Sequence, residues 1–104
     1  MTPSADSIGL KLLEIARAVE SSLWRRLRFE NDSACREALF NRYIRFARSV
    51  AAQEWRRRPA YGLERQDFDQ LAFGGLLDAI DNFDPLHGAS FESFARARIR
   101  GAIS

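Results

Sequence analysis

The sequence has 104 residues, of which 46% are hydrophobic and 29% are charged. This length suits one domain, and the ordinary globular balance argues against wholesale disorder. A single cysteine, Cys35, excludes an internal disulfide. No apolar run approaches the roughly 18 residues that a membrane span needs, and the N-terminus lacks the pattern of a secretory signal. We therefore expect a cytoplasmic protein.

Charge is unevenly distributed along the chain, although the net charge is only +2. Residues 1–58 carry twelve basic and seven acidic side chains, a net +5, whereas residues 64–92 carry one base and seven acids, a net −6. Single-sign surfaces of this kind attract partners of opposite charge. The alternative is that the segments fold together and neutralise each other. The charge pattern alone leaves both interpretations open.

The first predicted helix runs from about Ala5 to Phe29, with Ser4 as its N-cap. Its apolar residues fall three or four apart on one face, which is typical of an amphipathic helix: Ile8, Leu12, Ile15, Val19, Leu23 and Leu27. A break at residues 31–33 separates it from a second helix, expected over Ala34–Arg57. Pro59 ends the second helix, because proline restricts the residue before it and has no amide hydrogen to donate.

Asp67 is expected to cap a third helix, with Gln70 at the capping-box position three residues later. The core stripe of this helix is long and regular: Phe68, Leu71, Ala72, Gly75, Leu76, Ala79, Ile80 and Phe83. A proline–glycine turn follows, and Ser90 is expected to cap a fourth helix that continues to Ser104. The sequence thus predicts an all-α fold, a compact bundle of about four helices. We expect one domain over residues 1–104, with an N-terminal helix over 1–30 and the core over 34–104.

The third helix carries a second stripe, on the face opposite its core: Asp67, Gln70, Phe73, Gly74, Leu77 and Asp81. A solvated helix face does not normally show an aromatic residue and a leucine four positions apart. Each glycine inside a helix costs about 0.5–1 kcal/mol relative to alanine, so close approaches must offset the pair Gly74 and Gly75. Gly75 is expected to admit a neighbouring helix. For Phe73 and Leu77 two interpretations stay open: an external protein covers them, or the N-terminal helix does.

The fourth helix combines Phe91 and Phe94 with Arg96, Arg98 and Arg100. Aromatic rings stack on unstacked bases at about 1–3 kcal/mol per base, and arginines contact phosphates. The pattern is therefore typical of binding to single-stranded nucleic acid. The alternative is that both rings belong to the core and the arginines are solvated. Phe91 falls on the apolar stripe of this helix, so we expect Phe94 to be the more exposed ring.

No catalytic or metal-binding pattern accompanies these features. His87 is the only histidine and is expected in a surface turn, and Cys35 has no second cysteine to complete a zinc site. Gly74 and Gly75 lie within a helix and not in a phosphate-binding loop. We expect neither an enzyme nor a bound metal or cofactor.

Two ungapped runs carry a family resemblance. Gly75–Pro85 reads GLLDAIDNFDP, and Phe91–Ala102 reads FESFARARIRGA. They resemble the second conserved region of bacterial sigma factors of the primary and flagellar lineage, and the ending RIRGA is most similar to the flagellar class. Leu39–Pro59 resembles the helix that precedes these runs in the family. Roughly the first thirty residues resemble no family.

The resemblance implies two binding surfaces. In this family the third helix docks on the coiled-coil clamp of the largest RNA polymerase subunit. The matching positions are Asp67, Gln70, Leu71, Phe73 and Leu77. The next helix of the family captures flipped bases of the minus-ten promoter element on the non-template single strand. The matching positions are Phe91, Ser93, Phe94, Arg96, Arg98 and Arg100.

The sequence departs from the family pattern in two respects. Ala72 and Gly74 stand where the family usually has glycine and a bulky aliphatic residue, and Phe73 stands where it has a small or polar one. These changes imply an altered clamp contact. The resemblance also stops at Ser104, before the rest of the promoter-reading helix and the downstream DNA-binding domain. The sequence is therefore interpreted either as a fragment of a longer sigma factor or as a naturally truncated member of the family.

The leading hypothesis is a sigma-like domain that docks on the polymerase core and helps recognise and melt the minus-ten element in transcription initiation. The alternative is a truncated sigma-like regulator that binds polymerase or an anti-sigma factor without productive promoter binding. A second sigma half is a further expected partner. The two hypotheses differ in whether Phe94 and Arg98 contribute to any activity of the chain.

Overall fold

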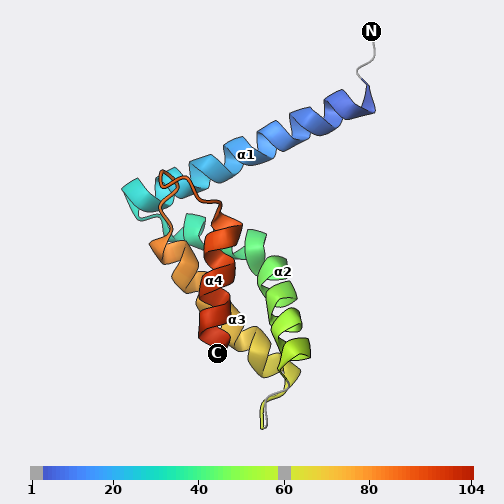
Figure 1. Ribbon diagram of the computed structural model, residues 1–104. Coiled ribbons are helices and arrows are strands. Elements are labelled where there is room, and N and C mark those ends of the chain that lie inside the picture. Colours follow the sequence, from blue (N-terminus) through green and yellow to red (C-terminus); the bar gives the residue numbers. More distant parts are fainter. Residues whose placement is uncertain (1–3, 59–61) are drawn as a thin grey trace. The chain divides into compact units, whose positions relative to one another are not determined.

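The computed structural model describes residues 4–58 and 62–104, and within these ranges the chain forms four α-helices and no strand (Figure 1). The helices are α1 (Ala5–Glu30), α2 (Ser33–Arg57), α3 (Arg65–Asn82) and α4 (Phe91–Ile103). This confirms the predicted all-α fold, and the bounds of α1, α2 and α4 lie within one residue of those expected. The chain divides into two compact units, Met1–Arg36 and Glu37–Ser104. The organisation as a single domain remains a prediction.

In the first unit, polar side chains cap both helices that it contains. Ser4 caps α1 as predicted, and Asn31 ends α1 in the left-handed conformation, with φ of 52°. The Asp32 carboxylate accepts a hydrogen bond from the backbone N–H of Ala34 at 2.9 Å, at the start of α2. It also pairs with Arg26 at 2.8 Å, and this hydrogen bond holds the pKa of Asp32 below its ordinary value.

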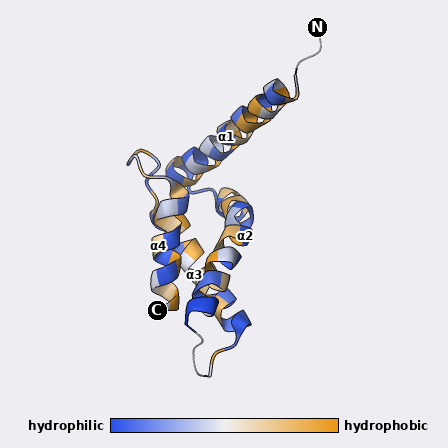
Figure 2. Ribbon diagram, turned by 45° about the vertical axis from the view of Figure 1, so that its right-hand side comes forward, coloured by the Kyte–Doolittle hydropathy of each residue, from blue (hydrophilic) through white to orange (hydrophobic). Residues whose placement is uncertain are grey.

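The apolar stripe of α1 is not covered within its own unit. Ile8, Leu12, Ile15 and Val19 are between 46% and 62% exposed, and Figure 2 shows hydrophobic and hydrophilic segments alternating along this helix. Toward the end of α1, the indole N–H of Trp24 donates to a carboxylate oxygen four residues earlier, at 3.3 Å. None of the described helices has the length and apolar character required to cross a membrane.

The core of the second unit is formed by one face of each of three helices. The buried residues come from α2 (Leu39, Ala47, Val50, Ala51), from α3 (Phe68, Ala72, Gly75, Leu76, Ala79, Ile80) and from α4 (Phe91, Ala95, Ile99, Ile103). Aromatic contacts join α2 to its neighbours: Trp55 meets Phe68 edge-on with ring centroids 5.3 Å apart, and Tyr43 lies 4.6 Å from Phe91. The predicted core stripe of the third helix is confirmed except at Leu71, which is 38% exposed.

The axes of α3 and α4 approach each other closely at Gly75. A Cβ atom added there would lie 2.8 Å from the Cα of Ile99 and 3.1 Å from the carbonyl oxygen of Arg98. Only glycine fits this contact without a shift of backbone, so the expected helix packing at Gly75 is confirmed. At Gly74, by contrast, an added Cβ would meet no heavy atom elsewhere in the described chain within 4 Å.

The start of α3 differs from the prediction. The helix begins at Arg65 with Glu64 as its N-cap, and the backbone N–H of Glu64 donates to the Asp67 carboxylate at 2.7 Å. The prediction that Asp67 is the cap and Gln70 the capping-box residue is therefore wrong. Asp67 lies one turn inside the helix and itself supplies the capping-box carboxylate. The predicted helix-ending role of Pro59 lies outside the described residues.

The turn between α3 and α4 is held by one aspartate. The Asp84 carboxylate accepts the backbone N–H of Leu86 at 2.9 Å, and the Asp84 carbonyl accepts that of His87 at 3.1 Å. Gly88 has φ of +85°, a conformation that favours glycine. Ser90 then caps α4, as predicted, by accepting the backbone N–H of Ser93 at 3.2 Å. These bonds fix where α4 begins relative to the end of α3.

Candidate functional site

Phe94 lies half-buried on α4, one turn after the helix begins. Its ring is supported by Phe83, at a centroid distance of 5.5 Å. Phe91 contacts the same Phe83 ring at 5.2 Å but is only 5% exposed. The two rings therefore differ as expected: Phe91 is a core residue, whereas Phe94 rests on the core and keeps part of its surface accessible.

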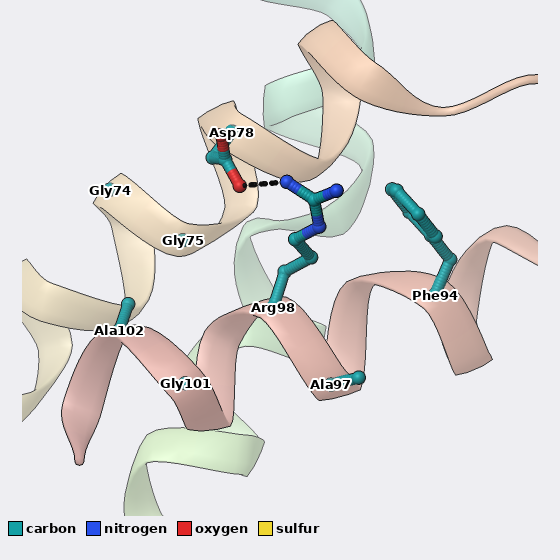
Figure 3. Close-up of a pocket in the computed structure, with 8 residues that line it drawn as sticks. All are labelled: Gly74, Gly75, Asp78, Phe94, Ala97, Arg98, Gly101 and Ala102. Atoms are coloured by element: carbon teal, nitrogen blue, oxygen red, sulfur yellow. Dashed lines mark hydrogen bonds and ion pairs between the residues drawn. The ribbon is translucent and has the colours of Figure 1, made fainter.

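Arg98 lies over the Phe94 ring. Its guanidinium carbon is 4.9 Å from the ring centroid, within the range of a cation–π contact. One of its nitrogens is also 2.7 Å from a carboxylate oxygen of Asp78 on α3, as Figure 3 shows. The ring, the guanidinium and the carboxylate thus lie side by side across α3 and α4. This pair joins a carboxylate of the acidic segment 64–92 to an arginine that follows that segment in the sequence.

Two of the pockets in the described chain are lined in part by Phe94. The first, of about 520 Å³, lies between α3 and α4 (Figure 3) and is lined by Gly74, Gly75, Asp78, Phe94, Ala97, Arg98, Gly101 and Ala102. The second, of about 360 Å³, lies at the turn and is lined by Asn82, Phe83, Asp84, His87, Ala89 and Phe94. Both volumes fall in the range of small-molecule sites. Phe94 is the residue that they share.

The second pocket contains residues that the sequence analysis did not assign to a site. His87 and Asp84 supply polar groups there, and Phe83 supplies an aromatic wall. Sequence reasoning treated these positions as a turn and as core. The sequence feature that could have indicated this pocket is the position of the turn, which ends directly before the helix that carries Phe94.

The other two predicted DNA-binding arginines also contact protein groups. Arg96 donates to the Gln53 side chain at 3.3 Å, and its guanidinium lies 5.1 Å from the Phe46 ring centroid. Arg100 lies 3.2 Å from a carboxylate oxygen of Glu54. Both contacts connect α4 to α2. Ser93 is exposed in the first turn of α4 and takes part in its capping.

The second stripe of α3 is only partly exposed. Gln70 and Asp81 are exposed, whereas Leu77 is half-buried. Leu71, which was predicted to belong to the core stripe, also faces solvent. Asp67 is half-buried too, and its carboxylate is occupied by the capping contact described above. The residues available for a partner are therefore concentrated at Gln70, Leu71, Gly74 and the exposed part of Leu77.

Phe73 has a partner inside the second unit that neither open interpretation included. Its ring meets Phe40 of α2 edge-on, with centroids 5.9 Å apart. The guanidinium of Arg48, also on α2, lies 5.5 Å from the Phe73 centroid. Part of this ring is consequently covered by α2, which explains why an aromatic residue is tolerated on the outward stripe.

Cysteine and histidine do not form a metal centre in the described chain. The ranges 4–58 and 62–104 contain no group of three or more His, Cys, Asp or Glu side chains placed to hold a metal ion. Cys35 is buried, and this burial raises the pKa of its thiol. His87 lies exposed in the turn, where it lines the second pocket.

Comparison with known proteins identifies the same segment. Residues 39–104 match the family model described as Sigma-70 region 2. RNA polymerase sigma factor FliA of Salmonella typhimurium is 38% identical over 68 residues, which cover 65% of this chain and 28% of that protein. FliA of Pseudomonas aeruginosa is 39% identical over 67 residues, covering 64% and 27%. RNA polymerase sigma-G factor of Bacillus subtilis is 37% identical over 81 residues, covering 78% and 30%.

The matched segment contains most of α2 and all of α3, the turn and α4, so it includes both stripes and both pockets described above. The chain spans less than a third of the length of these curated relatives. The similarity to FliA agrees with the flagellar-type ending found in the sequence. Because the family model matches well over half of its residues, the chain belongs to the Sigma-70 region 2 family.

Proposed function

We propose that the chain is a sigma domain that docks on the RNA polymerase core and holds the melted minus-ten element of a promoter during transcription initiation. The observation that carries this proposal is the placement of Phe94. Its ring lines two pockets, rests on Phe83 and has the Arg98 guanidinium beside it. An aromatic ring beside a guanidinium is an arrangement suited to an unstacked base.

A flipped base would stack on the Phe94 ring instead of on the neighbouring bases of its own strand. Stacking is tolerant of sequence, so selectivity has to come from polar groups at the edge of the base. In the pocket at the turn, Asp84 and His87 are such groups. The hydrogen bonds that Asp84 makes within the turn fix the position of these polar groups before a base binds. The site is thus preorganised and requires little ordering on binding.

The DNA part of the proposal is tested by titrating a fluorescent single-stranded oligonucleotide with the non-template minus-ten sequence. We expect Phe94→Ala to weaken binding by roughly 5- to 150-fold, which corresponds to the loss of about 1–3 kcal/mol of stacking. Phe29→Ala is the matched control, because Phe29 is 81% exposed on α1 in the other unit. Equal effects of the two substitutions would show that Phe94 is not a base platform.

The polymerase part of the proposal rests on the exposed stripe of α3. Gln70 and Leu77 offer a hydrogen-bonding amide and an apolar surface about two turns apart on the helix. Gln70→Ala combined with Leu77→Ala should abolish micromolar binding to the isolated clamp coiled coil, measured by calorimetry. Leu86→Ala serves as the apolar control, because Leu86 is 90% exposed but lies in the turn. Failure of the folded wild-type chain to bind the clamp would refute this part.

A second candidate function is that of a regulator, which binds polymerase or an anti-sigma factor without productive promoter binding. The specific observation that favours it is the pairing of the α4 arginines: Arg98 with Asp78, and Arg100 with Glu54. Pairing reduces the charge that α4 offers to phosphates. The two functions are distinguished by the wild-type chain alone. Clamp binding without any binding of the oligonucleotide would favour the regulator.

A further inference from the structure

Glu54 is a buried carboxylate near the C-terminal end of α2. It is only 4% exposed, and it is the one charged or polar residue classed as buried in the described chain. Three guanidiniums surround it: Arg57 at 3.4 Å, Arg58 at 3.2 Å and Arg100 of α4 at 3.2 Å. A buried carboxylate is stable only when it is paired and hydrogen-bonded, so these contacts account for its position.

The three arginines outnumber the carboxylate that holds them. The group carries three positive charges and one negative charge, a net +2. The arginine side chains remain 66%, 51% and 44% exposed, in chain order. They border an open pocket of about 570 Å³ lined by Glu54, Arg57, Arg58, Arg100, Gly101 and Ser104. A guanidinium has five N–H donors, and Glu54 engages only one nitrogen of each in these contacts.

We propose that Arg57, Arg58 and Arg100, which we call the arginine cluster and which all contact Glu54, bind one backbone phosphate of promoter DNA. Guanidiniums match phosphate oxygens in pairs of parallel hydrogen bonds, and such charge-assisted bonds are short and strong. The assignment rests on the proposed function, because it requires the domain to bind DNA. It adds the end of α2 to the DNA-binding surface.

The spacing along α4 favours a DNA phosphate as the ligand. Phe94 and Arg100 are six residues apart on one helix, which corresponds to about 9 Å at 1.5 Å per residue. A strand whose base stacks on Phe94 therefore has its backbone close to Arg100, which lies on the same helix.

The test compares two double variants of the full chain that lose the same charge. Arg57→Gln with Arg58→Gln removes two members of the arginine cluster. Arg25→Gln with Arg45→Gln removes two exposed arginines elsewhere, one on α1 and one on α2. The ligand is a fork-junction DNA with a short upstream duplex and a single-stranded non-template overhang. Affinity is measured by fluorescence anisotropy between 50 and 200 mM salt, and folding is checked by circular dichroism.

We expect the arginine-cluster variant to bind the fork roughly tenfold or more weakly, with a log–log salt slope reduced by about 0.9 for the lost phosphate contact. The control variant should change the slope much less. Equal slopes and affinities for the two variants would overturn the arginine cluster as a specific site while leaving the proposed function intact. Absence of fork binding by the wild-type chain would overturn both, so the two failures are distinguishable.

A second set of probes separates a DNA phosphate from a free anion. Methylphosphonate linkages, which lack the phosphate charge, are placed one at a time along the fork. At one position near the flipped base, a neutral linkage should weaken wild-type binding but have no further effect on the Arg57/Arg58 variant. Inorganic phosphate is titrated as the comparison. Chemical-shift changes at residues 54–58 with phosphate, combined with fork binding that no neutral linkage affects, would assign the arginine cluster to a free anion and overturn the proposal.

Discussion

Gly74 and Gly75 are adjacent in α3, so the energy of the contact between α3 and α4 at Gly75 can be measured with Gly74 as the reference. At Gly75 a Cβ would meet backbone atoms at 2.8 and 3.1 Å, so α4 as a whole would have to move. Overpacking of this kind costs about 1–3 kcal/mol, and because the obstructing atoms are backbone we expect the upper end. Alanine recovers about 0.8–1.0 kcal/mol of helix propensity. Gly75→Ala should therefore lower the free energy of unfolding by about 2 kcal/mol.

Gly74→Ala makes the same chemical change one residue earlier, where an added Cβ has open space. It should raise the free energy of unfolding by up to about 1 kcal/mol. The propensity term cancels between the variants, so the expected gap of about 3 kcal/mol measures the α3–α4 contact. Urea unfolding followed by circular dichroism at 222 nm gives both values, provided that the m-values agree. If both alanines stabilise the chain equally, the inferred contact at Gly75 is refuted.

Two further predictions concern charged groups. Asp78→Asn removes the ion-pair partner of Arg98. Single-stranded DNA should then bind several-fold more tightly and with a steeper salt dependence in a filter-binding assay. Unchanged affinity would show that the ion pair does not restrain Arg98. Asp32 has a folded-state pKa below its ordinary 3.8, so its contribution to stability is present above that value and is lost as the pH falls through the lowered pKa. Helicity and melting temperature of the wild type and of Asp32→Asn, measured between pH 5 and pH 2, should therefore differ at pH 5 and converge in acid.

The helices were predictable because their apolar residues repeat with the helical period over several turns. The stripe from Phe68 to Ile80 determines which face of α3 is buried, and the serines at positions 4 and 90 mark helix starts through their own hydrogen bonds. The start of α3 was not predictable in the same way. Glu64 is an unusual N-cap, and Asp67 satisfies the capping pattern from inside the helix.

The candidate site was predictable only in part. Phe94 and the arginines were visible in the sequence, because aromatic and basic residues close together on one helix are uncommon in a solvated face. Their partners were not visible, since Asp78 and Glu54 reach them across the fold from positions 20 and 46 residues earlier than Arg98 and Arg100. The cover of Phe73 by Phe40 likewise depends on how α2 lies against α3. Such long-range pairs follow from the packing of helices and not from any local pattern.

The two tryptophans of the chain are distributed one to each compact unit. Trp24 lies in α1 beside a carboxylate and the Arg28 guanidinium, whereas Trp55 lies edge-on against Phe68. Each unit therefore contains its own intrinsic fluorophore, in a different electrostatic environment. Single Trp→Phe variants would report the melting of one unit at a time without any attached dye. Coincident curves would mean that the units unfold as one cooperative body, and separate curves would mean that α1 melts independently of the helices that carry Phe94.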